Sequence, residues 1–351
     1  MSFVHTALDA LAVLTERYAF AEVAALLAAG AGGERLSAHE VASLQQLCAF
    51  GQRLLDLDAE DFGRPDAISG SNIEHAVADR VRGEVVPSKL LERSLECRMP
   101  QSPREKPRGA LGSLRPAYRL MLEVVRARFA RRETANVVAT VHIVSEYAPL
   151  LVWERALGHA GDPVLLPRDV DGEGSMWGEF DLRECPHTKT EKSAAKRALT
   201  VARGNSAGWQ SYLDRQHSIV AHALAICAAS CRRRCTVYTR LSPQERATVT
   251  AGSRIAVALD ESAIVRLRHS APVGHAFGVP SQTELLEAWD RTRRSLMRFA
   301  PTLEDDDGFP LPGFTALVSE LAGAPMAPDT LLADTASAIR ALLEVAATGP
   351  A

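Results

Sequence analysis

The chain has 351 residues, rich in alanine and poor in aromatic residues, a composition that favours a helical bacterial protein of one or two domains. The formal net charge of -3 excludes a general attraction to nucleic acid or anionic membranes. No uninterrupted apolar run is long enough to span a membrane, and six unevenly spaced cysteines without a signal peptide indicate free thiols in the cytoplasm.

Residues 1–57 are expected to form an αα-hairpin. An apolar stripe predicts a helix over residues 3–29, and Ser37 with Glu40 three positions later predicts a capping box at the start of a second helix. Such a hairpin packs in a bundle or binds a partner helix, so a protein partner is expected. Arg53 is the only basic residue along the second helix, which argues against DNA recognition.

Residues 58–114 contain five prolines among polar residues, which predicts a linker or loops with short helices at residues 72–82 and 88–97. Residues 115–351 are then expected to form the main helix-rich domain. The fold class is therefore mainly α, formally α+β, because a small antiparallel sheet is predicted in the C-terminal half.

Two helices begin the main domain. The first, residues 115–133, has an arginine-rich face, and the second, residues 135–158, places His142 and Glu146 one turn apart on an apolar face. Such a pair either works as a metal or acid–base pair or satisfies itself by a hydrogen bond. Pro149 is expected to kink or restart the second helix.

The stretch from 204 to 238 holds the densest set of reactive side chains. A helix over residues 209–235 places His217, Cys227 and Cys231 on one apolar side, where cysteine acts as a small hydrophobic residue. An alternative is a tetrahedral zinc site, in which Cys185 and His187 from the preceding loop join Cys227 and Cys231. The three sulfurs and one nitrogen are a common zinc ligand set.

Haem is a second cofactor hypothesis for the same helix. An apolar helix that carries one imidazole is suited to supply an axial ligand, and His217 and His222 are the two candidates. The competing interpretation is a hydrogen-bonded core histidine.

Residues 204–208 read G-N-S-A-G, the pattern of the nucleophile elbow of serine hydrolases. A strand is expected before it at residues 198–202, and Asp260 and His275 follow Ser206 in the order of a catalytic triad. Together with a G-H-A-F loop at residues 274–277, residues 199–299 resemble the end of a dienelactone-hydrolase type chain. The resemblance implies a parallel sheet, with Ser206 as nucleophile, Asp260 as acid and His275 as base.

The C-terminal part alternates between predicted strands and capped helices. Period-two patterns predict the strands of the small antiparallel sheet, and S-x-x-E capping boxes at Ser242 and Ser281 predict helix starts. The final helix is expected at residues 329–347. The three strands are expected at residues 236–241, 254–259 and 263–268.

Four basic clusters are candidate contacts for nucleic acid or an acidic partner, although aromatic residues for base stacking are scarce. The basic clusters are residues 115–132, 189–203, 232–234 and 291–298. The sequence has no nucleotide-binding motif.

The leading functional hypothesis is a soluble cytoplasmic accessory protein that binds a macromolecular partner, of undetermined oligomeric state. The alternatives are a haem- or metal-dependent enzyme and a serine hydrolase.

Overall fold

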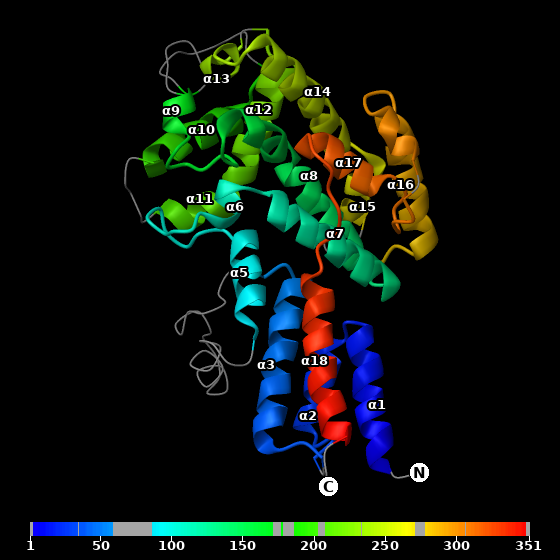
Figure 1. The fold of residues 1–351 in the computed structure, drawn as a ribbon. Coiled ribbons are helices and arrows are strands. Elements are labelled where there is room, and N and C mark those ends of the chain that lie inside the picture. The colour runs from blue at the N-terminus through cyan, green and yellow to red at the C-terminus, as the bar shows by residue number, and fades with distance from the viewer. Residues whose placement is uncertain are drawn as a thin grey trace. The chain divides into compact units, whose positions relative to one another are not determined.

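The computed structural model is mainly helical, and the residues that it describes contain no strand (Figure 1). The prediction of a mainly α protein is confirmed. The chain divides into two compact units, which are described separately: unit 1 combines Met1–Arg98 with Asp329–Ala351, and unit 2 is Met99–Pro328. The structure describes residues 3–33, 35–58, 86–170, 177, 186–202, 208–232, 234–270, 278–305 and 307–348.

Unit 1 is a bundle built from both ends of the chain. The C-terminal helix α18 packs against α1, α3 and α5, so the N-terminal hairpin finds a partner helix within its own chain. The single helix predicted over residues 3–29 is wrong, because the chain turns at Tyr18, which has a φ of +56°. The helices are α1 (Phe3–Glu16), α2 (Phe20–Ala28), α3 (Ala38–Leu55), α5 (Ser88–Cys97) and α18 (Leu331–Thr348).

Unit 2 is organised around α8 (Thr134–Leu157), which packs against α7, α12, α14, α15 and α17. Pro149 lies inside α8 without ending it. The other helices are α6 (Gly109–Gly112), α7 (Arg115–Ala130), α9 (Pro167–Val170), α10 (Lys189–Ala202), α11 (Trp209–Arg215), α12 (His217–Ala229), α13 (Thr236–Thr239), α14 (Pro243–Asp260), α15 (Ala263–Ser270), α16 (Gln282–Leu296), the 3-10 helix η3 (Pro301–Glu304) and α17 (Phe314–Ala322).

Within the described residues, α8 alone is long and apolar enough to cross a membrane. Of its most apolar window, 61% is buried against the other helices of unit 2. A long, largely apolar helix that is mostly buried is typical of the core of a globular unit. We therefore assign α8 as a core helix.

The three capping boxes predicted from the sequence are confirmed. At Ser37, Ser242 and Ser281 the hydroxyl accepts from the backbone amide three residues later, and the glutamate at that position accepts from the serine amide. Each motif satisfies two amides that the first helical turn would otherwise leave without partners.

The antiparallel sheet predicted in the C-terminal half is wrong. Residues 236–239, 254–259 and 263–268 belong to α13, α14 and α15. The helix that starts at the Ser242 capping box does not stop before the alternating residues but continues to Asp260. It packs closely on α8, since a Cβ atom at Gly252 would lie 2.8 Å from Val152. Burial on α8 therefore outweighs the short period-two pattern.

The single helix predicted over residues 209–235 is also wrong. Gln216 separates α11 from α12, and α12 ends at Ala229. The chain then turns and begins α13 after Cys235, which is the N-cap residue of that helix. This turn changes which cysteines come together.

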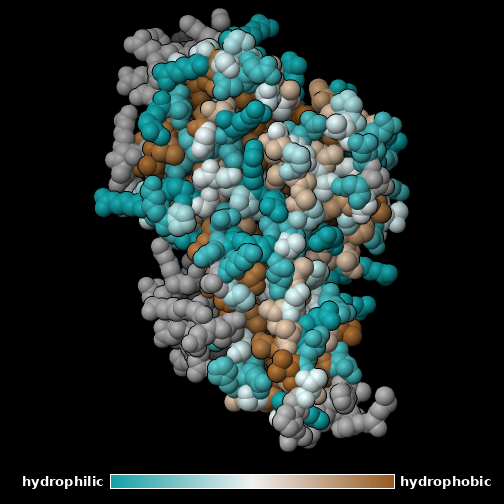
Figure 2. Space-filling model, viewed as in Figure 1, coloured by the Kyte–Doolittle hydropathy of each residue, from teal (hydrophilic) through white to brown (hydrophobic). Residues whose placement is uncertain are grey.

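The visible surface carries hydrophobic residues in several small groups separated by hydrophilic ones (Figure 2). Exposed large apolar side chains of unit 1 include Val13 and Val345, and those of unit 2 include Val279 and Phe299. Apolar residues scattered in this way are normal for a folded surface. They do not define a docking site.

Candidate metal site

Three buried side chains of unit 2 converge in one place. One ligand atom each from His187, Cys227 and Cys235 lies within 4.8 Å of the other two. Among the described residues this is the one group of three or more metal-ligating side chains that converges so closely. We call these three residues the His–Cys–Cys cluster.

The turn after α12 brings the two cysteines together. Cys227 lies in the last turn of α12, and the backbone amide of Cys235 donates to its sulfur over 3.2 Å. Arg234 fixes the same turn, because its guanidinium donates to the backbone carbonyls of Cys227 and Ala228 at the end of α12. Amides that donate to a sulfur stabilise its thiolate, which is the form that binds metals.

His187 is held by the start of α10. The Glu191 carboxylate accepts from the Thr188 amide over 2.6 Å, and the Glu191 amide donates to the Thr188 hydroxyl over 3.2 Å. The same carboxylate lies 3.7 Å from Nδ1 of His187. In metal sites, a carboxylate on one ring nitrogen of a histidine orients the other nitrogen towards the metal.

The surroundings of Cys227 favour its protonated thiol as long as no cation is bound. The hydrogen bond with the Cys235 side chain, together with burial, holds the pKa of Cys227 well above the usual thiol range. Burial raises the pKa of Glu191, but its contacts with His187 and Thr188 outweigh burial, and the net pKa is lowered. An ionised Glu191 therefore lies beside the imidazole.

The residues present fit a thiophilic divalent cation. Two sulfurs and one imidazole are ligands that zinc takes in structural sites, and in a tetrahedral zinc site such atoms lie roughly 3.6–3.8 Å apart. Because the ligand atoms of the cluster lie within 4.8 Å of one another, metal binding would require a contraction of at most about 1 Å. Because all three residues are buried, the cation would be enclosed by protein, as in a structural site.

The structure brings together two of the four predicted zinc ligands, His187 and Cys227. Cys231 is buried nearby but lies outside the His–Cys–Cys cluster. The ligand position that was predicted for Cys231 is taken by Cys235. Cys185 lies outside the described residues. Cys235 is absent from the predicted ligands because a single helix was expected from 209 to 235. The largely polar run from Ser230 to Arg234, which follows the end of α12, is the signal that could have placed the helix end correctly.

The two histidines proposed as haem ligands have different surroundings. His217 is fully buried beside the rings of Tyr147 and Tyr212, and its Nε2 bonds to the carbonyl of Ala160 over 3.2 Å. His222 is partly exposed, and its Nε2 lies 3.7 Å from the Asp260 carboxylate. The environment of His217 is that of a core histidine.

Acid should destabilise the fold through His217. Burial lowers its pKa from the ordinary 6.5 to about 4. The unfolded chain therefore binds a proton that the folded chain does not bind between these values, so stability falls as pH drops through this window. We expect a loss of about 2 kcal/mol between pH 7 and pH 5, measured by urea unfolding.

His217→Gln tests the assignment, because glutamine keeps a donor for Ala160 but does not titrate in this range. The variant should be less stable at pH 7 yet lose less stability than the wild type on going to pH 5. An equal pH dependence in both proteins would show that another group controls the acid response.

The strand expected before the serine hydrolase elbow is wrong, because residues 198–202 are the end of α10. Asp260 is the last residue of α14 rather than a residue after a strand. Ser206 and His275 lie outside the described residues. The hydrolase hypothesis has therefore lost the strand–turn–helix context that its motif requires.

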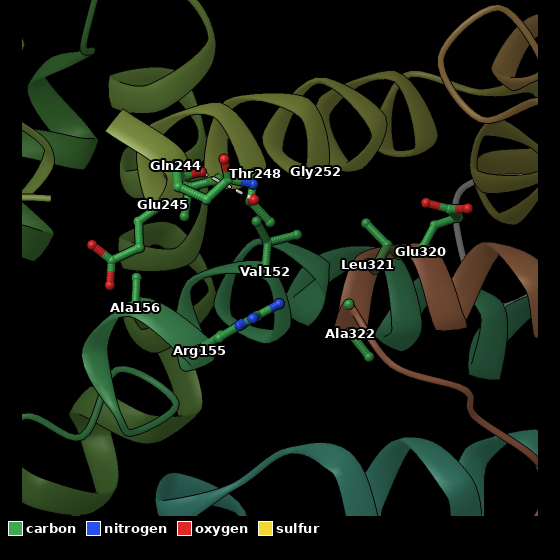
Figure 3. Close-up of a pocket in the computed structure, with 12 residues that line it drawn as sticks. Val152, Arg155, Ala156, Gln244, Glu245, Thr248, Gly252, Glu320, Leu321 and Ala322 are labelled. Atoms are coloured by element: carbon green, nitrogen blue, oxygen red, sulfur yellow. Dashed lines mark hydrogen bonds between the residues drawn. The ribbon is translucent and has the colours of Figure 1, made fainter. Parts of the chain in front are cut away.

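A small cavity of about 90 Å³ lies between α8, α14 and α17 (Figure 3). Arg155, Glu245 and Glu320 contribute charged side chains from the three helices. Glu245 is engaged in the Ser242 capping box, and Glu320 accepts from the Thr302 hydroxyl. The cavity is far below the roughly 300–1,000 Å³ of small-molecule pockets, so we do not assign it a ligand.

Many of the arginines expected to bind nucleic acid contact the protein itself. Arg128 and Arg131 pair with Glu133, and Arg293 donates to the backbone carbonyls of Leu303 and Glu304. Arg294 pairs with Asp290 on an exposed helix face. These contacts show that much of the positive charge is already neutralised or used for folding.

No known protein family, no curated protein and no solved structure matches this chain. Its function must therefore be argued from its own residues.

Proposed function

We propose that this chain is a zinc-binding accessory protein, in which the metal joins the start of α10 to the end of α12 and the start of α13. The main observation in support of this proposal is that His187, Cys227 and Cys235 converge in a buried position of unit 2. The Glu191 carboxylate beside His187 and the amide that donates to Cys227 support the same assignment.

A stabilising role suits the cluster better than a catalytic one. Three protein ligands alone would leave a fourth coordination position open, as in catalytic zinc, so a structural site here needs a fourth ligand. The burial of all three residues favours such a closed arrangement over access by water or substrate. The metal would supply binding energy that favours the folded state. Binding to a macromolecular partner, the role expected from the sequence, stays a prediction.

Metal analysis of the purified full chain without a histidine tag tests the proposal. We expect about one equivalent of zinc per chain, and a thiolate-to-cobalt charge-transfer band after exchange with Co²⁺. Removal of the metal with a chelator should lower the melting temperature, and added Zn²⁺ should restore it. A metal-free chain whose stability does not respond to Zn²⁺ would refute the proposal.

Substitution of Glu191 should weaken metal binding without removing a ligand. We expect Glu191→Ala to lower zinc affinity about 10- to 100-fold, the usual effect of losing a carboxylate that orients a ligating histidine. Glu191→Gln retains a capping group for the Thr188 amide but not the negative charge, and should have a smaller effect. Competition with a chromophoric chelator measures both affinities.

Glu245→Ala is the matched control for this experiment. Glu245 also closes a capping box in unit 2, but it belongs to α14 and its partner is Ser242. Its loss should reduce helix stability and leave zinc affinity unchanged. An equal loss of zinc affinity in both variants would mean that the loss of a helix cap is enough to weaken binding, and that Glu191 does not act by orienting His187.

A further inference from the structure

One cysteine of unit 2 lies next to the His–Cys–Cys cluster without belonging to it. The described cysteines of unit 2 are Cys227, Cys231 and Cys235, and the cluster includes all of them except Cys231. The Cys231 side chain is buried, with 1% of it exposed. The cluster supplies three ligands, whereas a closed tetrahedral zinc site takes four.

The end of α12 determines where the three sulfur atoms of this stretch lie. On a continuous helix, the eight residues from Cys227 to Cys235 would correspond to a rise of about 12 Å. The two sulfur atoms instead lie within 4.8 Å of each other, because α12 ends at Ala229 and the chain turns before α13 begins. Cys231 is part of this turn, four positions from each of the other two cysteines. The turn therefore removes the divergence that a continuous helix would impose on the three thiols.

A backbone hydrogen bond holds Cys231 beside the last turn of α12. The Cys231 amide donates to the carbonyl of Ile226 over 3.0 Å, and Ile226 directly precedes Cys227 in the chain. The charge of Cys231 also contributes to the raised pKa of the Cys227 thiol. Because Cys231 follows the end of the helix, its rotamer is not restricted by a preceding helical turn, and a change of rotamer moves its sulfur by roughly 3 Å.

The Glu191 carboxylate is another candidate close to the cluster, but its position suits an orienting role. It lies 3.7 Å from Nδ1 of His187 and accepts from the Thr188 amide over 2.6 Å. With this carboxylate at Nδ1, His187 would bind a metal through Nε2, on the other side of the imidazole ring. Glu191 therefore orients the histidine and does not complete the site.

We propose that Cys231 is the fourth ligand of the zinc site proposed above, which is then a closed site of three sulfurs and one nitrogen. Binding of Zn²⁺ removes one proton from each of the three thiols, so zinc and three thiolates carry one net negative charge. Arg234 contributes a positive charge from the same turn, where its guanidinium donates to backbone carbonyls at the end of α12. Three sulfur ligands select thiophilic cations such as Zn²⁺ over Mg²⁺ and Mn²⁺, which prefer oxygen ligands.

X-ray absorption at the zinc edge tests this assignment in the wild-type full chain, loaded with one equivalent of Zn²⁺. We expect three sulfur ligands at about 2.3 Å and one nitrogen ligand at about 2.0–2.1 Å. Two sulfurs with two nitrogen or oxygen ligands would overturn the assignment of Cys231 but leave the proposed zinc site in place. A chain that binds no zinc would refute both proposals.

Two serine variants identify the third sulfur. Cys231→Ser should reduce the number of sulfur ligands from three to two and lower zinc affinity at least about 100-fold. Cys185→Ser is the matched control, because Cys185 is close to His187 in the sequence but lies outside the described residues. The control should keep three sulfur ligands and the affinity of the wild type. Loss of a sulfur ligand in Cys185→Ser and not in Cys231→Ser would assign the fourth position to Cys185 and overturn the proposal.

Discussion

Asp162→Ala is expected to lower the free energy of unfolding of unit 2 by about 3–5 kcal/mol, the usual effect of removing one partner of a buried ion pair. The Asp162 side chain is 1% exposed, and the Arg108 guanidinium donates to both of its oxygens, over 2.7 and 2.9 Å. The carboxylate also accepts from the amide of Val164. The variant would leave the partly buried positive charge of Arg108 without its carboxylate.

Urea unfolding followed by circular dichroism measures the loss. Asp290→Ala is the matched control, because Asp290 also pairs with an arginine in unit 2, Arg294, but on the exposed surface. Exposed pairs contribute about 0–1 kcal/mol, so the control should be nearly neutral. If Asp162→Ala lowers the free energy of unfolding no more than Asp290→Ala does, the buried pair does not stabilise unit 2 as its geometry implies.

The double variant Arg108→Met with Asp162→Leu separates the value of the pair from the cost of an unpaired charge. Replacement of both partners by apolar groups removes the charges together, and it should be less destabilising than Asp162→Ala alone. A double variant that is as unstable as the single one would indicate that loop packing dominates.

Cys227→Ser is expected to reduce zinc affinity by at least about 100-fold, because the binding energy of a structural site, about 10–16 kcal/mol, is shared among few ligands. Cys235→Ser and His187→Gln should act similarly. Cys48→Ser is the control, since Cys48 is a buried free cysteine of unit 1, with its pKa raised by burial to about 12. It should leave the metal content unchanged.

Cys231→Ser distinguishes two descriptions of the site. Cys231 is buried, and its charge contributes to the raised pKa of Cys227, but it lies outside the close group of ligand atoms. A large loss of affinity would mean that Cys231 moves to become a fourth ligand when metal binds. Retained affinity in all of the cysteine variants would reject the cluster as a metal site.

Local signals in the sequence predicted much of the helical structure. The serine and glutamate pairs at Ser37, Ser242 and Ser281 identified three helix starts, because a capping box depends on residues only three positions apart. The period-two pattern at 254–259 was misleading, since the decisive interaction was the packing of α14 on α8 at Gly252. Such contacts between distant residues cannot be deduced from a short window.

Only part of the candidate site could be predicted, again because the rest depends on contacts between distant residues. The types of residue identified a set of nitrogen and sulfur ligands that included His187 and Cys227. Whether Cys231 or Cys235 is the ligand depends on where α12 ends and how the chain turns after it. Helical periodicity alone predicted a helix that was too long. The contact of Glu191 with His187 is the carboxylate–histidine arrangement of metal sites, but Glu191 is also part of a capping box, whose sequence pattern signals a helix start and not a metal site.

The arrangement of α18 has a consequence for biosynthesis. Residues 331–348 complete the bundle that the first 98 residues begin, and the whole of unit 2 is encoded between them. During translation, unit 2 can fold while the first helices still lack their last partner. The nascent N-terminal helices therefore expose apolar surface until the final helix leaves the ribosome, and chaperones that shield such surface have a defined interval in which to act.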